Sequence, residues 1–351
     1  MGKDRQGSQA EEILRLNLYV HFPFCRRKCT YCALHSRAGS SPEDRAAYVA
    51  KLTDALSRMN LAPRSLTTVY FGGGSPALCD LRPLLAALAP LLGNECEFTV
   101  ELHPLDVCRE TLDVLASGGV NRISMGVQSL HDATLRHMGR GYSADEAERA
   151  FSLVKERFDN AGIDLIAGYP GDPCDVAAME RLSNWGLRHC SVYSLILEER
   201  SILAKQAAKL DFPDDDKVLD TIKAVSRFLR SIGLERYEIS NYATPGFECR
   251  HNMAVWRGED YAGLGDGAHG RLGRLRTESG KTESVTPEED EKERRLFRLR
   301  TVEGLDASGH GEWTGVLDAF ADKGLLTKDG AVYRLTERGT EVCDSILAEL
   351  V

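Results

Sequence analysis

The sequence lacks a long apolar run: none approaches the ~20 residues needed to cross a bilayer. The first six residues, Met1 to Gln6, are polar and contain no apolar segment of the kind found in signal peptides. Gln6 stands where a myristoylation signal on Gly2 would carry Ser or Thr. These absences predict a cytoplasmic protein.

An excess of positive charge is also missing. The chain has 44 Lys and Arg against 53 Asp and Glu, a formal net charge of −9. Because neutralisation of phosphates by basic side chains drives nucleic-acid binding, this balance predicts no nucleic-acid partner.

The first two thirds of the chain alternate between two patterns, and no other repeat is present. Short runs rich in β-branched and aromatic residues lie at 18–22, 68–71, 98–101, 122–127, 164–167 and 191–196. Segments with helical apolar spacing lie between them, at 42–59, 81–92, 111–116, 145–158 and 176–185. Such alternation predicts an α/β fold with a parallel sheet. Six units suit an open, partial barrel, whose ligands gather at the carboxyl ends of the strands.

Four regions follow from composition and pattern. They are a polar N-terminal tail (1–15), the partial barrel with a C-terminal extension (16–275), a charged linker (276–295) and a winged-helix-like C-terminal domain (296–351). In the last region helices flank a hairpin at Asp329-Gly330, and Thr336 is expected to cap the final helical segment. Acidic residues slightly outnumber basic ones there, which favours packing or partner contact over DNA binding.

Cysteine is abundant, with 10 residues scattered too widely for a disulfide framework. Seven are isolated and are expected to be small buried hydrophobic residues: Cys79, Cys96, Cys108, Cys174, Cys190, Cys249 and Cys343.

The other three cysteines, Cys25, Cys29 and Cys32, form one cluster directly after the first strand. Thiolates bind iron–sulfur clusters and zinc, and structural zinc needs four ligands. Three thiolates leave one iron of a cubane open, so the spacing favours an iron–sulfur cluster. Zinc with His35 or His21 as a fourth ligand stays an alternative.

Three cations lie between the first two cysteines: Arg26, Arg27 and Lys28. Positive charges near a thiol lower its pKa. We therefore expect these side chains to ease thiolate formation in the cluster loop.

The segment from Leu18 to Cys25, with Lys28-Cys29-Thr30-Tyr31-Cys32, resembles the radical S-adenosylmethionine (SAM) superfamily. It is most similar to the branch that holds oxygen-independent coproporphyrinogen III oxidase and the heme chaperone HemW. The resemblance runs from about Leu18 to the C-terminus. It implies a partial (β/α)6 barrel, in agreement with the strand pattern.

The resemblance also implies a [4Fe-4S] cluster on Cys25, Cys29 and Cys32, and a set of residues that contact S-adenosyl-L-methionine. The glycines of Phe71-Gly72-Gly73-Gly74-Ser75-Pro76 let the backbone approach a ligand closely. The residues implied to bind S-adenosylmethionine are Tyr19, Gly73, Gly74, Ser75, Glu101, Gln128, Arg140 and Asp164.

One departure bears on the activity. The oxidase carries a fourth cysteine two places after the third, whereas Ala33 and Leu34 follow Cys32 here. This difference favours a HemW-type protein that binds heme and delivers it to client proteins. An oxidase that converts coproporphyrinogen III to protoporphyrinogen IX, or a radical methyltransferase acting on tetrapyrroles, stays an alternative. Whether the chain is an enzyme is left open.

Cys249 to Trp256 resembles the chaperone's His-Asn-x-x-Tyr-Trp signature, which makes His251 a candidate heme ligand. The alternative for His251 is a hydrogen-bonded structural role. Val255 replaces the family's tyrosine, His103 its asparagine and Tyr142 its histidine. These departures suggest an altered substrate.

The expected cofactors are therefore a [4Fe-4S] cluster, S-adenosyl-L-methionine and heme. The expected partners are heme or porphyrin, respiratory heme-protein clients and an electron donor of the flavodoxin or ferredoxin type. A membrane-surface contact and a homodimer are further expectations.

Overall fold

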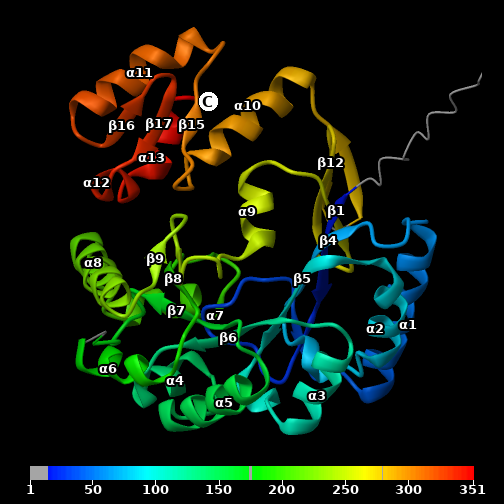
Figure 1. Ribbon diagram of the computed structural model, residues 1–351. Coiled ribbons are helices and arrows are strands. Elements are labelled where there is room, and N and C mark those ends of the chain that lie inside the picture. The colour runs from blue at the N-terminus through cyan, green and yellow to red at the C-terminus, as the bar shows by residue number, and fades with distance from the viewer. Residues whose placement is uncertain (1–14, 174–175, 279) are drawn as a thin grey trace, which may run out of the picture.

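The structure, a computed structural model, describes residues 15–173, 176–278 and 280–351. Residues 1–14 of the expected tail and Cys174 lie outside this part. Figure 1 shows a curved sheet wrapped by helices in the first two thirds of the chain, and a smaller unit at the C-terminus.

Six parallel strands follow one another in the sheet in chain order, so the predicted α/β alternation is confirmed. They are β1 (Leu16–Phe22), β4 (Leu66–Gly73), β5 (Leu92–Leu102), β6 (Arg122–Gln128), β7 (Ala161–Ala167) and β8 (His189–Ser194). A seventh strand, β11 (Tyr261–Leu264), pairs in parallel with the other edge of β1 and was not predicted.

Antiparallel strands extend both ends of this sheet. On the side of β11 they are β12 (His269–Leu272), β13 (Leu275–Glu278) and β14 (Lys281–Ser284). Beyond β8 they are β10 (Asn241–Ala243) and β9 (Glu235–Arg236). The short strands β2 (Phe24–Cys25) and β3 (Arg37–Ala38) form a separate pair beside the cysteine cluster.

Helices cover the outer face of the sheet (Figure 1). They are α1 (Pro42–Arg58), α2 (Arg82–Leu88), α3 (Arg109–Ser117), α4 (Asp132–Met138), α5 (Ala144–Arg157), α6 (Val176–Glu180) and α8 (Asp215–Ser231). Two further helices, α7 (Ile202–Gln206) and α9 (Arg250–Trp256), lie near the ends of the strands. Short 3₁₀ helices occupy Pro76–Leu78, Ala89–Leu91, Pro104–Asp106, Arg181–Asn184 and Ala207–Lys209.

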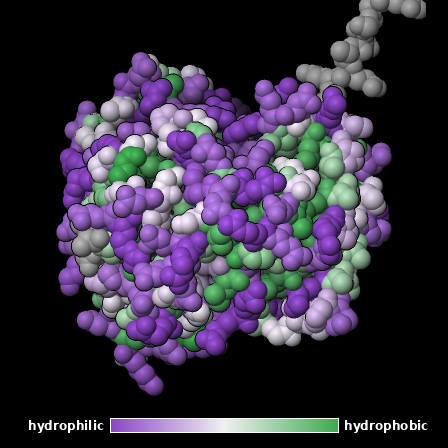
Figure 2. All heavy atoms as spheres, turned by 60° about the horizontal axis from the view of Figure 1, so that its bottom comes forward, coloured by the Kyte–Doolittle hydropathy of each residue, from purple (hydrophilic) through white to green (hydrophobic). Residues whose placement is uncertain are grey.

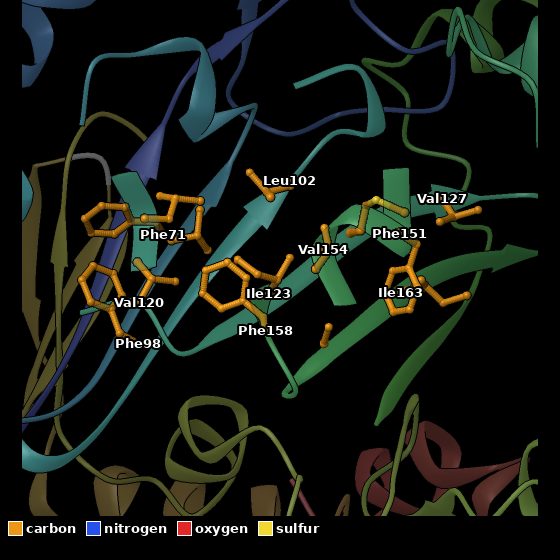
Figure 3. Packing of buried hydrophobic residues seen from close by; sticks show 14 of the residues in the cluster. Phe71, Phe98, Leu102, Val120, Ile123, Val127, Phe151, Val154, Phe158 and Ile163 are labelled. Atoms are coloured by element: carbon orange, nitrogen blue, oxygen red, sulfur yellow. The ribbon is translucent and has the colours of Figure 1, made fainter. Parts of the chain in front are cut away.

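Local sequence explains where the longer helices begin. Ser41 and Ser143 each form a capping box with an acidic residue three positions on, which satisfies free backbone donors of the first turn. The helices bury their apolar faces against the outer face of the sheet. Figure 3 shows this core, where Phe151 and Val154 of α5 lie over Ile123 and Ile163 of the strands.

Residues 276–295 differ from the charged linker that their composition predicts. They contain the end of β13, all of β14 and most of α10 (Pro287–Arg298). Ion pairs hold the hairpin to the helix: the guanidinium group of Arg276 lies 2.6 Å from Asp290 and 2.6 Å from Glu293. The charges of this segment therefore pair with one another across two elements, which a reading of composition does not reveal.

The C-terminal unit has its own core around Leu299, Trp313, Leu317 and Ile346. Its elements are β15 (Leu305–Asp306), α11 (Gly311–Asp322), β16 (Leu326–Asp329), β17 (Val332–Leu335), α12 (Glu337–Thr340) and α13 (Cys343–Ala348). Strands β16 and β17 form the predicted hairpin. The Thr336 hydroxyl accepts a hydrogen bond from the Gly339 amide and so caps α12 rather than the last helix, α13.

No helix in the described ranges is long and apolar enough to span a bilayer. The face of the molecule in Figure 2 is largely hydrophilic, with hydrophobic side chains gathered in patches between the polar ones.

Candidate functional site

The inner face of the sheet is polar although the strands themselves are apolar in composition. In β1, Leu18, Val20 and Phe22 face the helices and are fully buried, whereas Tyr19 and His21 alternate with them on the inner face. The same alternation places polar side chains of the other strands on this face: Thr68 and Tyr70, Glu97 and Glu101, Arg122 and Ser124, Asp164, His189 and Ser191. The strands thus bury a hydrophobic layer outside and present titratable groups inside.

The cysteine loop runs from the end of β2 to Cys32 and is anchored through Thr30. The Thr30 amide donates to the carbonyl of Met138 (3.1 Å), and its own carbonyl accepts from the Leu203 amide (2.7 Å). Its hydroxyl also bonds that of Tyr169 at 2.8 Å. The ends of α4 and α7 therefore fix the loop that carries the three thiols.

At Cys25 the cations of this loop do not lower the pKa of the thiol as their positions in the sequence predict. Burial raises the pKa of the Cys25 thiol above its usual value, and Lys28 opposes this only weakly. The Lys28 ammonium is instead bonded to the Leu34 carbonyl (2.8 Å) and the Ser36 hydroxyl (2.7 Å). The expectation of a lowered pKa is wrong for Cys25, because desolvation outweighs the nearby charge.

The glycine turn after β4 lies against Cys25. Gly73 has φ +106°, and a Cβ there would lie 2.5 Å from the His21 ring. A Cβ at Gly74 would lie 2.4 Å from the Phe24 carbonyl and 2.9 Å from the Cys25 sulfur. Only glycine therefore lets this backbone pass so close to the thiol.

Ser75 continues the turn and leads back to the cysteine loop. Its hydroxyl donates to the buried carboxylate of Asp106, and the other oxygen of that carboxylate lies 2.5 Å from Nε of Arg26. Asp106 thus ties the glycine turn to the residue that follows Cys25. The sequence pattern did not single out Asp106, since the short 3₁₀ helix Pro104–Asp106 that ends with it carries no recognisable motif.

Glu101, at the end of β5, reaches the same turn. Its carboxylate accepts from the Tyr70 hydroxyl (2.8 Å) and from the Gly73 amide (3.1 Å). Desolvation, with repulsion from Asp164 second, raises its pKa to about 7. Asp164 on β7 accepts from the Ser124 hydroxyl at 3.1 Å, and burial raises its pKa as well.

Gln128 stands at an irregularity at the end of β6. It has φ +72°, and the register between β6 and β7 shifts between Gly126 and Gln128. A left-handed conformation is uncommon outside glycine, and bulges at strand ends redirect side chains toward sites.

Arg140 is buried and joins the cysteine loop to the end of β6. Its guanidinium group bonds the Gly126 carbonyl and donates from Nη1 to the Cys29 sulfur at 3.4 Å. Its Nε donates to the Tyr142 hydroxyl at 2.8 Å, which itself donates to the carbonyls of Gly126 and Val127.

Two of the departures from the family pattern touch each other. The rings of His103 and Tyr142 meet edge to face with centroids 5.1 Å apart. Burial, followed by the charges of Arg140 and Arg26, lowers the pKa of His103 to about 2, so its imidazole is neutral.

His251 is enclosed, 4% exposed, at the start of α9. The Thr68 hydroxyl donates to Asn17, so the 2.7 Å contact between Thr68 and His251 has Nδ1–H of His251 as donor. The His251 ring lies beside the rings of Tyr70 (5.2 Å) and Tyr19 (6.4 Å). Burial lowers its pKa to about 3. Nδ1 of His251 is thus engaged within the protein, and the ring is enclosed by tyrosines.

The structure thus brings the predicted residues together at one end of the sheet. Cys25, Cys29, Gly74 and Arg140 are linked by direct contacts, and Tyr70 and Gly73 link Glu101 to them. Tyr19 reaches this group through stacking on Tyr70, with centroids 6.1 Å apart. Asp164 on β7 lies near enough to Glu101 for its charge to raise the pKa of that carboxyl, and Gln128 ends β6. Tyr70 and Ser124 were missed, although both occupy inward positions of the two-residue period.

The donor set fits an iron–sulfur cluster better than zinc. Within the described residues no three His, Cys, Asp or Glu side chains converge to hold a single metal ion. A cubane does not require such convergence, because each thiolate binds a different iron. His21 is unsuited as a fourth zinc ligand, since Nδ1 bonds the Tyr19 hydroxyl and Nε2 bonds the His35 carbonyl.

Comparison with known proteins identifies relatives of this chain. Residues 19–181 match the model of the radical SAM superfamily. The heme chaperone HemW of Lactococcus lactis is 36% identical over 74% of this chain and 70% of that protein. The heme chaperone HemW of Bacillus subtilis is 31% identical over 95% of this chain and 99% of that protein. The solved structure of coproporphyrinogen III oxidase (HemN) from Escherichia coli covers 96% of this chain and 90% of its own, with 21% identity and a TM-score of 0.82.

Proposed function

The chain belongs to the radical SAM superfamily and, within it, to the family of the HemW proteins; from this premise we propose that it binds heme and delivers it to client proteins. Membership implies a [4Fe-4S] cluster and S-adenosylmethionine. We assign the cluster to Cys25, Cys29 and Cys32.

One observation supports this assignment above the others. The glycine turn, Glu101 and Arg140 come from distant parts of the chain and meet beside the cysteine loop. A cluster held by Cys25, Cys29 and Cys32 would supply an electron to a bound sulfonium ligand. The chain's own part is to hold that ligand and to exclude water from it.

The residues divide this task by their chemistry. The carboxylate of Glu101, which the Gly73 amide holds in place, suits the ammonium end of an amino acid. Tyr19, Ser75, Gln128 and Asp164 provide further polar contacts along the strand ends. Arg140 places a positive charge beside Cys29.

Leu34 favours heme carriage over the oxidase alternative. This residue occupies the position of the oxidase's fourth cysteine, and 56% of it is exposed. A leucine offers no sulfur ligand at that point. The side chain presents apolar surface beside the cysteine loop instead.

Anaerobic reconstitution followed by titration with hemin tests the proposal. A heme-binding protein gains a Soret band at micromolar hemin, with iron and sulfide contents that correspond to one cubane per chain. An oxidase instead converts coproporphyrinogen III to protoporphyrinogen IX when S-adenosylmethionine and a reductant are supplied. Turnover of that substrate without hemin binding would reverse the assignment.

A further inference from the structure

A cavity of about 380 Å³ lies beside the cysteine loop. Its walls include Cys32, Leu34, His35, Arg37 and Arg200. The volume falls in the range of about 300–1,000 Å³ that is typical of small-molecule sites. Because Leu34, His35, Arg37 and Arg200 are exposed, the cavity opens to solvent.

His35 is an exposed residue in the wall of this cavity. Its main-chain carbonyl accepts from Nε2 of His21 at 2.8 Å, which fixes the backbone beneath the ring. Gly267, with φ +88°, leaves room for the side chain, since a Cβ there would lie 2.6 Å from Cβ of His35 and 2.9 Å from Cγ of its ring. No ring nitrogen of His35 has a hydrogen bond or ion pair within the described part of the chain. An exposed imidazole without a partner is available to a metal.

The charges around the cavity favour an anion. Arg37 lies over the Phe24 ring, 5.1 Å from its centroid, and neither Arg37 nor Arg200 pairs with a carboxylate among the described residues. Asp266, the acidic residue in the wall, is paired with Lys51 at 2.9 Å. Two arginines in the wall that have no carboxylate partner among the described residues suit carboxylate groups, because the planar guanidinium fork matches a carboxylate.

Heme has three parts that the side chains of this cavity match. These side chains are an imidazole, an exposed apolar side chain and two arginines. Heme iron takes a histidine nitrogen as an axial ligand, the macrocycle is apolar, and the propionates are anionic. His251 offers an imidazole too, but the rings of Tyr19, Tyr70 and Tyr261 surround it. A large planar ligand reaches His251 only if that packing opens.

We propose that the cavity beside the cysteine loop is the heme site, with His35 as axial ligand and Arg37 and Arg200 facing the propionates. The proposal rests on the proposed function, heme carriage, and adds the site and its ligand. An open site suits a carrier, because heme has to leave it intact. It also differs from the buried position that the signature around His251 predicts.

The test is a hemin titration of the anaerobically reconstituted protein, with cluster content verified first because Cys32 lines the cavity. The variants are His35→Ala, His251→Ala and, as a matched control, His137→Ala, an exposed histidine on α4. We expect His35→Ala to lose the Soret band that is typical of low-spin heme. We expect free imidazole to restore this band. His137→Ala keeps the band, and His251→Ala keeps it wherever the cluster content is normal.

Arg200→Glu probes the propionate contacts, with hemin affinity as a second readout. We expect hemin affinity to fall about two- to fivefold, the size of one exposed charge contact. Two results distinguish a failure of the proposed function from a failure of the proposed site. If the wild type shows no Soret band, heme carriage itself fails. If His35→Ala binds hemin like the wild type while His251→Ala with a full cluster does not, heme carriage stands and the site is at His251.

Discussion

Arg140 donates a hydrogen bond from Nη1 to the sulfur of Cys29 at 3.4 Å. Hydrogen bonds and positive charge at a cysteine sulfur stabilise the reduced form of an iron–sulfur cluster, so they raise its reduction potential. Tyr142 holds the arginine in place through Nε, and the backbone of β6 holds Tyr142. The side chains of Tyr142 and Arg140 thus connect the end of β6 to the cysteine loop.

The first prediction concerns the contact between His103 and Tyr142. Tyr142→His removes the hydroxyl that bonds Arg140 and two carbonyls. We expect a loss of about 1–3 kcal/mol in the free energy of unfolding. A lower cluster reduction potential should accompany it, because Arg140 is released from Cys29. Denaturant unfolding and a potentiometric titration followed by electron paramagnetic resonance (EPR) measure the two effects.

The matched variant is the double exchange His103→Asn with Tyr142→His, which restores the family's pair. Because the two rings are in contact, the second change should recover part of both effects. Additive losses in the double variant would show that the two side chains are not energetically coupled.

The second prediction concerns the turn at Gly74. A methyl group there meets the Phe24 carbonyl and the Cys25 sulfur, so Gly74→Ala should displace Cys25. We expect a lower iron and sulfide content after anaerobic reconstitution. Gly315→Ala on α11 is the control, since nothing lies within 4 Å of a Cβ at that position. A full cluster in Gly74→Ala would mean that the turn moves at little cost.

The third prediction follows from Glu101. Its pKa is about 7 in the ligand-free protein, against an ordinary value of 4.5. Between these values the folded chain holds a proton that the unfolded chain has lost, so this group lowers stability as pH rises from about 4.5 to 7. Glu101→Gln removes the penalty. We expect this variant to be more stable than the wild type at pH 8, by about 1–3 kcal/mol, and the difference to shrink at pH 5.

The affinity for S-adenosylmethionine should rise with pH, whereas the stability contribution of Glu101 falls. The ionised carboxylate favours a cationic ligand, so wild-type affinity rises with pH through about 7 and Glu101→Gln binds weakly throughout. Calorimetric titration at several pH values measures this. Glu95→Gln, which changes an exposed residue of β5, serves as the control. Equal affinity of Glu101→Gln and the wild type at pH 8 would remove Glu101 from the ligand site.

Much of the barrel could be predicted from sequence because its strands carry local signals. All six runs of β-branched and aromatic residues became parallel strands in the expected order. Strand β11 was missed because Tyr261–Leu264 is short and precedes glycine-rich turns, and its place beside β1 is a tertiary contact. The hairpin and helix of residues 276–295 were missed because Arg276 and Asp290 appear only as charges until folding pairs them.

The site, too, has residues that local motifs reveal and residues that only tertiary contacts reveal. The cysteine spacing and the glycine turn are local motifs, and both lie where they were expected. Tyr142 and Asp106 take part through contacts with Arg140, Ser75 and Arg26, which no spacing reveals. For His251 the motif indicated a ligand, whereas burial among tyrosine rings indicates packing.

The central claim is that the cysteine loop carries a cubane whose open iron binds S-adenosylmethionine. EPR of the dithionite-reduced, reconstituted protein, recorded with and without S-adenosylmethionine, tests it most directly. We predict that the cluster signal changes when the ligand is added to the wild type, and that the change weakens in Glu101→Gln. An identical spectrum at saturating ligand, in protein with a complete cluster, would contradict the claim.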